Sequence, residues 1–257
     1  SSYYKMTDSY NSFQVGDLSC SPQHFEEMAC LDHKHHVFIG GNHDNYDLEL
    51  TNLKEADQTQ TIVGFGQYNH AEQFSGFLNE VNDEPAVYKF KHLPKHHLGN
   101  FGVWPIPGAK SKTMKNEIFF VRGAWSIDGR FRRANGWDWW PREQLSSYEC
   151  TQAIELYEQN KPDFVVSHCC PLQILPMLNL PYSGGRPIPT QTGSLLNFLF
   201  EAHQPKYWIF GHYHQHFDIV HKGTRFICLN MCPNPGWTVE FDQELNLVEF
   251  YPDLDFL

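Results

Sequence analysis

The chain lacks the features of a membrane protein or of a general nucleic-acid binder. No apolar run approaches the roughly 18 residues that a membrane span needs, and residues 1–12 show no basic and apolar signal pattern. Basic residues are few, since 19 Lys and Arg stand against 30 Asp and Glu for a net charge of −11. A broad basic face for nucleic acid or an anionic membrane is therefore not expected. We expect a cytoplasmic protein with no membrane partner.

The cysteines show no pattern of a disulfide framework or a zinc knuckle. There are seven of them, scattered along the chain without a C-x-x-C pair. An odd number at such spacing is typical of reduced thiols in an intracellular protein. We expect packed, inert thiols, including those of the adjacent Cys169 and Cys170.

Short β-rich runs alternate with amphipathic segments, and there is no internal repeat. This alternation predicts an α/β fold, and we expect one domain over residues 1–257. Four predicted strands each run into a turn with polar residues, at 12–15, 36–39, 163–166 and 207–210. In α/β sheets such strand ends form the ligand sites.

The remaining segments divide into helices, a strand pair, a polar segment and a strand-rich tail. Helices are expected at 22–34, 142–161 and 192–203, the second following Pro141, and strands at 101–106 and 117–122. Between about 48 and 97 the polarity rises and the periodicity weakens, which indicates an insertion or a lid. The tail from Phe217 to Tyr251 is expected to close the domain as an antiparallel meander.

The four strand ends carry the residue types of a metal site. They read VGDL, GGNHD, VVSH and FGHYH, and supply Asp17, Asn42, His43, Asp44, His168, His212 and His214. Carboxylate, amide and imidazole groups without a thiolate suit a divalent cation that activates water, such as Mn, Zn, Fe or Ni. A lone Asp after a strand is ordinarily a helix cap, and a lone His is ordinarily structural. The metal-site interpretation therefore depends on finding these residues together at four strand ends.

The order and the sequences of these segments resemble the motifs of the calcineurin-like metallophosphoesterase superfamily, which run D-x-H, G-D, G-N-H-[DE], H and G-H-x-H. The resemblance covers about residues 13–216. The segments GAWSID, WWP and SGGRPIPTQTGS are similar in sequence to a bacterial and phage branch of the superfamily. It implies a four-layer αββα sandwich with two mixed sheets. It also implies hydrolysis of phosphomonoesters or phosphodiesters by water activated at a dinuclear metal centre.

The resemblance assigns the metal ligands as follows. Asp17 would bridge two divalent ions. Asn42, His168 and His212 would complete one metal site, and His214 would belong to the other.

The resemblance also implies a catalytic pair. His43 would lie beside the leaving-group oxygen as general acid or electrostatic stabiliser, and Asp44 would hold its orientation.

One motif of the superfamily is missing. D-x-H should precede Gly16-Asp17 by some tens of residues, but only fifteen residues stand there and none forms the motif. Because the chain begins with Ser and not Met, we expect the parent protein to carry the motif upstream. If the motif is truly absent, one metal site is incomplete. The alternative is then a catalytically impaired metal-binding, phosphate-binding or scaffold protein.

The substrate expected from these motifs is a small phosphoester or a nucleotide. Protein phosphatases of the superfamily carry an Arg soon after G-D and read G-N-H-E, whereas this chain reads GDLSCS and GNHD. Arg130 and Asp128 are the best candidates for substrate binding at the pocket rim, and Arg186 is a lesser one. The alternative is a loop whose tryptophans pack on the core and whose arginines pair with acids. A nuclease would need a basic track, which the sequence does not show.

Overall fold

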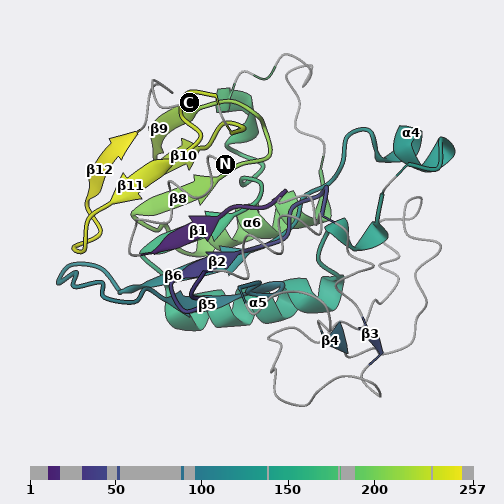
Figure 1. Cartoon of the computed structure of the whole chain (residues 1–257). Coiled ribbons are helices and arrows are strands. Elements are labelled where there is room, and N and C mark those ends of the chain that lie inside the picture. The colour runs from purple at the N-terminus through teal and green to yellow at the C-terminus, as the bar shows by residue number, and fades with distance from the viewer. Residues whose placement is uncertain are drawn as a thin grey trace.

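A six-stranded mixed sheet forms the centre of the computed structural model (Figure 1). The structure describes residues 11–17, 31–44, 51–52, 88–89, 96–137, 139–178, 180, 189–232 and 234–250. In spatial order the strands are β5 (Phe101–Pro105), β6 (Glu117–Val121), β7 (Phe164–Ser167), β8 (Tyr207–Phe210), β10 (Thr224–Cys228) and β9 (Phe217–His221). The four inner strands are parallel, and both edge strands pair antiparallel. The inner strands therefore end at a common edge.

Helices cover one face of this sheet. The two long helices of this layer are α5 (Ser147–Asn160) and α6 (Gln191–Ala202), and the short helices η3 (Pro141–Glu143) and η4 (Leu175–Leu178) lie near them. A further short helix, α4 (Gly129–Ala134), projects away from the sheet (Figure 1). Phe119, Val165 and Trp208 face the long helices and pack in one core with Tyr157 and Leu199. Since side chains alternate along a strand, the neighbours of these residues face the opposite side.

Two small sheets cover the other face. β1 (Ser12–Gln14) pairs in parallel with β2 (His36–Phe38), and β11 (Val239–Phe241) pairs antiparallel with β12 (Leu247–Phe250). Phe120, Val166 and Ile209 pack there against Val37 and Phe241. The layering of helices, sheet and facing sheets confirms the predicted α/β sandwich in the described residues. The facing layer consists of two separate hydrogen-bonded pairs.

Some sequence predictions need correction. The helix that was expected from residue 142 begins five residues later, at Ser147, because Ser146 and Glu149 form a capping box that fixes its start. The predicted helix over 22–34 lies mostly outside the described residues, and its end at 31–34 is a turn.

The tail is two hairpins rather than one meander. β9 and β10 join the central sheet, whereas β11 and β12 pair only with each other. The reason is that β10 already has β8 on one side and β9 on the other, so neither of its edges can receive β11.

The segment expected as an insertion or lid, 48–97, lies largely outside the described residues. Its described parts include β3 (Thr51–Asn52), which pairs antiparallel with β4 (Tyr88–Lys89). His97 bridges Phe38 in parallel, so the chain returns beside β2. Among the described residues, no helix is long and apolar enough to cross a bilayer.

Cys150, Cys169, Cys170 and Cys228 are free thiols, as predicted. Cys169, Cys170 and Cys228 are buried, and burial raises the pKa of Cys170 to about 12. A thiol that stays protonated is a poor nucleophile and a poor metal ligand. These side chains therefore contribute packing.

Candidate metal centre

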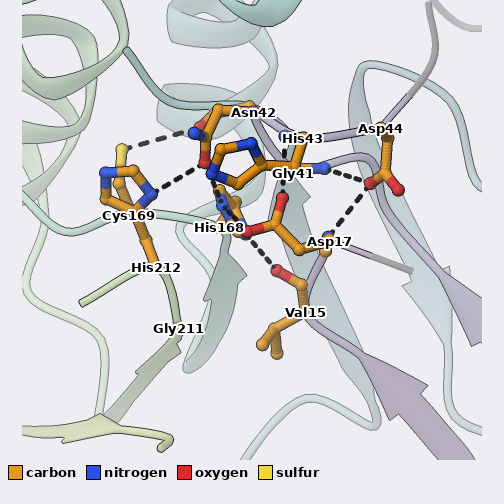
Figure 2. Close-up of polar contacts among 12 residues, drawn as sticks. Val15, Asp17, Gly41, Asn42, His43, Asp44, His168, Cys169, Gly211 and His212 are labelled. Carbon is orange, nitrogen blue, oxygen red and sulfur yellow. Dashed lines mark hydrogen bonds and ion pairs between the residues drawn. The ribbon is translucent and has the colours of Figure 1, made fainter. Parts of the chain in front are cut away.

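Three loops place Asp17, Asn42 and His168 in contact at the ends of β1, β2 and β7 (Figure 2). The His168 Nε2 atom lies 3.0 Å from Asn42 Oδ1 and 3.4 Å from Asp17 Oδ2. All three positions were predicted as metal ligands, and they come from segments far apart in the sequence. β1 and β2 run parallel in one small sheet and β7 lies in the central sheet, and the loops at the carboxyl ends of these strands meet at the site.

A fourth loop, after β8, adds His212. Its Nδ1 atom lies 2.9 Å from Asn42 Oδ1, and its ring centroid is 5.1 Å from that of His168. The Asn42 amide oxygen therefore stands between two imidazole nitrogens. The backbone holds this loop in place, since Gly211 N donates to the His168 carbonyl at 3.0 Å.

The backbone at this site is strained. Asp17, His212 and His214 have φ of 56°, 69° and 52°, values that a residue with a side chain rarely adopts. Each such residue costs about 1–3 kcal/mol and persists only where its surroundings enforce it. Strain at three of the predicted ligands is typical of a functional site.

Two glycines allow the loops to approach closely. A Cβ atom on Gly16 would overlap the His168 ring, and one on Gly41 would overlap the Asp17 carboxylate. Both positions therefore require the smallest residue if the Asp17 and His168 side chains are to meet.

Asp44 ties two of these loops together. Its buried Oδ2 atom accepts hydrogen bonds from Asp17 N at 3.0 Å and from Gly41 N at 2.6 Å. The Asp17 side chain is held in turn by His43 N, which donates to Oδ1 at 2.9 Å. The backbone of GGNHD thus positions the Asp17 carboxylate.

The electrostatics favour a charged Asp17. Burial alone would raise the pKa of Asp17, but the charge and hydrogen bond of His168 and the His43 N–H hold it well below its ordinary value. Burial also opposes charge on His168, yet Asp17 raises its pKa above the ordinary value. Burial and the nearby charge of His168 lower the pKa of His212 to about 3, so this ring is neutral at pH 7.

The donor atoms suit a divalent cation. His168 Nδ1 lies 2.7 Å from the Val15 carbonyl, to which it donates, so a neutral ring turns the lone pair of Nε2 toward Asn42 and Asp17. A lone pair facing two oxygen atoms is unfavourable unless a proton or a cation lies between them. Within the described ranges, no three His, Cys, Asp or Glu side chains are already gathered as a metal site. The centre is therefore a set of converging donors that are hydrogen-bonded to one another.

Comparison with known proteins identifies the family. A family model described as calcineurin-like phosphoesterase matches residues 11–216. The chain belongs to the calcineurin-like phosphoesterase family. The family generally uses divalent metal ions, and membership supports phosphoester hydrolysis as the activity.

Two further comparisons add little to the family assignment. No curated protein matches the chain in sequence. Among solved structures, it is similar to a phosphopantetheinyl hydrolase from Mycobacterium tuberculosis, with 15% identity and a TM-score of 0.42. That similarity covers 89% of this chain and 85% of the other.

Two other histidines that the family motifs assign lie close by in sequence. His43 is half-buried and follows Asn42, whereas His214 is exposed on the loop after β8. Among the described residues, no hydrogen bond joins His214 to Asp17 or His212. The roles of His43 as acid and of His214 at a second metal stay predictions.

Two of the three substrate-binding candidates, Asp128 and Arg130, lie on or near α4, which projects away from the central sheet (Figure 1). Asp128 precedes this helix and forms an ion pair with Arg132, with 2.7 Å between Oδ2 and Nε. Arg130 is exposed on α4. Arg186 lies outside the described residues.

Two further polar side chains, those of Ser126 and Glu143, are hydrogen-bonded behind Asn42. Asn42 Nδ2 donates to Ser126 Oγ at 3.0 Å, and Ser126 Oγ donates to Glu143 Oε2 at 2.6 Å. Ser126 lies within GAWSID, and the resemblance of this segment to other members of the family was the signal that could have pointed to it. No feature of the sequence marked Glu143.

Proposed function

We propose that the chain is a metal-dependent hydrolase of small phosphoesters, in which Asp17, Asn42, His168 and His212 hold a divalent cation. The contacts of Asn42 Oδ1 with His168 and His212, beside the Asp17 carboxylate, carry the proposal. These donors come from four separate loops and are largely buried.

When bound, a divalent cation supplies Lewis acidity toward phosphoryl oxygens and acidifies water. The protein supplies the arrangement around it. Asp17 stays ionised because His168 and the His43 N–H stabilise its negative charge. His212 stays neutral and keeps a nitrogen lone pair for a cation.

His43 acts on the leaving group in this proposal. It follows Asn42 directly, and its own N–H fixes Asp17, so its ring is held next to the metal ligands. A general acid there would protonate the departing oxygen. His214 would be one ligand of a second divalent ion, whose remaining ligands the superfamily takes from the D-x-H motif.

A small phosphoester or nucleotide is the substrate that we propose. GDLSCS lacks the Arg of the protein phosphatases, and Arg130 is retained as the candidate for a phosphate contact. Mn, Zn, Fe and Ni all suit the mixed oxygen and nitrogen donors.

The test is a substrate panel on chelator-stripped protein, with Mn²⁺, Zn²⁺, Ni²⁺ and Mg²⁺ added back singly. The panel contains a chromogenic phosphomonoester, a chromogenic diester, cyclic nucleotides and a dinucleoside polyphosphate. We expect metal-dependent hydrolysis that Asp17→Asn abolishes. The control is Asp218→Asn, which changes an exposed residue of β9 that is ion-paired with Arg225, and it should leave hydrolysis intact. Metal binding without turnover would instead support the impaired binding protein.

A further inference from the structure

A buried chain of hydrogen bonds leads from the Asn42 amide into the protein. Asn42 Nδ2 donates to Ser126 Oγ at 3.0 Å. Glu143 then accepts twice from Ser126, from the hydroxyl at Oε2 (2.6 Å) and from the backbone N–H at Oε1 (2.7 Å). Ser126 is 2% exposed and Glu143 is 1% exposed, so water does not replace either partner.

The direction of these hydrogen bonds follows from the chemistry of the carboxylate. Above its raised pKa of about 7, Glu143 is ionised and its carboxylate can only accept, so the Ser126 hydroxyl hydrogen then points to Glu143. The lone pairs of the hydroxyl oxygen are then left for Asn42, whose Nδ2 must donate to them. With Nδ2 engaged, Oδ1 faces the opposite side, where His168 Nε2 and His212 Nδ1 lie.

The segments that carry Ser126 and Glu143 are anchored independently of Ser126. Gly123 N donates to the Gly40 carbonyl at 2.8 Å, which joins the loop after β6 to the loop of Asn42. Arg122 Nη1 donates to the Arg142 carbonyl at 2.7 Å, next to Glu143. A Cβ atom on Gly123 would overlap the Glu143 carbonyl, so the two segments are in direct contact.

We propose that Ser126 and Glu143 are positioning residues that fix the orientation of the Asn42 amide, so that its oxygen and not its nitrogen meets the metal. An amide rotated by 180° would present N–H groups to the cation and repel it. The inference rests on the proposed function, because it takes Asn42 Oδ1 as a ligand. Neither residue touches the cation or the substrate.

The experiment compares two variants of this pair with two matched controls. Ser126→Ala removes the acceptor for Asn42 Nδ2. Glu143→Gln keeps the shape but replaces one acceptor with a donor, so one of the two Ser126 donors meets an N–H group. The controls are Ser146→Ala and Glu149→Gln at the start of α5, where an equally buried Glu149 accepts from Ser146 N at 2.7 Å and from Asn100 Nδ2 at 2.5 Å.

The first readout is the Mn²⁺ dissociation constant of chelator-stripped protein, measured by titration calorimetry beside the thermal unfolding midpoint. We expect Ser126→Ala and Glu143→Gln to weaken Mn²⁺ binding about 10–100-fold, the usual effect of removing a group that orients a ligand. The controls should lower the unfolding midpoint while leaving Mn²⁺ affinity within about twofold. If Ser126→Ala does not fold, Glu143→Gln alone decides.

Wild-type affinity in both variants, or an equal loss in the controls, would overturn the inference and leave the proposed function standing. If wild-type protein binds no Mn²⁺ and hydrolyses no phosphoester, the proposed function fails instead. Hydrogen exchange of the Asn42 side-chain amide in metal-free protein still tests the orientation in that case. We expect slow exchange in wild type and Ser146→Ala and fast exchange in Ser126→Ala, and slow exchange in Ser126→Ala would refute the inference.

Discussion

Glycine matters at this site for what it lacks. At Gly41 there is room for the backbone alone, because the Asp17 carboxylate and the His168 ring occupy the space where a side chain would lie. The same residue donates its N–H to Asp44 at 2.6 Å. The loop after β2 thus positions the Asp17 carboxylate both by contact and by hydrogen bonding.

We predict that Gly41→Ala weakens Mn²⁺ binding at least about tenfold, since the added methyl must displace the carboxylate of Asp17, a proposed metal ligand. Titration calorimetry on the stripped protein measures this. Gly108→Ala is the control, because its φ is +73° but nothing lies within 4 Å of an added Cβ. That variant should lose stability through backbone strain and keep its metal affinity, and an unchanged affinity in Gly41→Ala would contradict the account.

His43→Ala separates catalysis from metal binding. His43 holds Asp17 through its backbone N–H, which the substitution keeps, so we expect metal content to be unchanged. Loss of a general acid should lower kcat about 10²–10⁴-fold on a substrate with a poor leaving group. Activity assays and elemental analysis of the same sample measure both quantities, with the exposed His33→Ala as control. A parallel loss of metal would show that the ring is a ligand.

At the scale of elements, strands were predictable where apolar runs end in polar turns. β8 was predicted at its observed bounds, and β7 within one residue. The start of α5 was not, because the apolar spacing continues back to Leu145 while the capping box of Ser146 and Glu149 decides the boundary. A local hydrogen bond of this kind outweighs periodicity at a helix end.

The segment between β6 and α5 should make stability depend on pH through Glu143. Burial raises its pKa from 4.5 to about 7, so between these values the folded protein keeps a proton that the unfolded chain releases. Stability contributed by this group is present below pH 4.5 and is lost as pH rises toward 7, by on the order of 3 kcal/mol. Urea unfolding from pH 4.5 to 8 should show this fall in wild type and a smaller one in Glu143→Gln. Identical slopes would contradict it.

For the molecule as a whole, the layering brings together what the sequence separates. Four of the predicted ligands meet because β1 and β2 run parallel on one side and β7 and β8 run parallel in the central sheet. This convergence could be predicted, since the motifs stand at strand ends. The support from Ser126 and Glu143 could not, because nothing in spacing or composition shows that a serine after β6 lies under an asparagine after β2.

The most direct test of the account is a crystal structure of the protein grown with Mn²⁺, with anomalous diffraction measured near the Mn edge. We predict an anomalous peak within about 2.0–2.3 Å of Asp17 Oδ2, Asn42 Oδ1, His168 Nε2 and His212 Nδ1, the usual range for oxygen and nitrogen ligands. If no anomalous peak lies near these four atoms, or if a peak appears only elsewhere on the chain, the claim that they form the metal centre is contradicted.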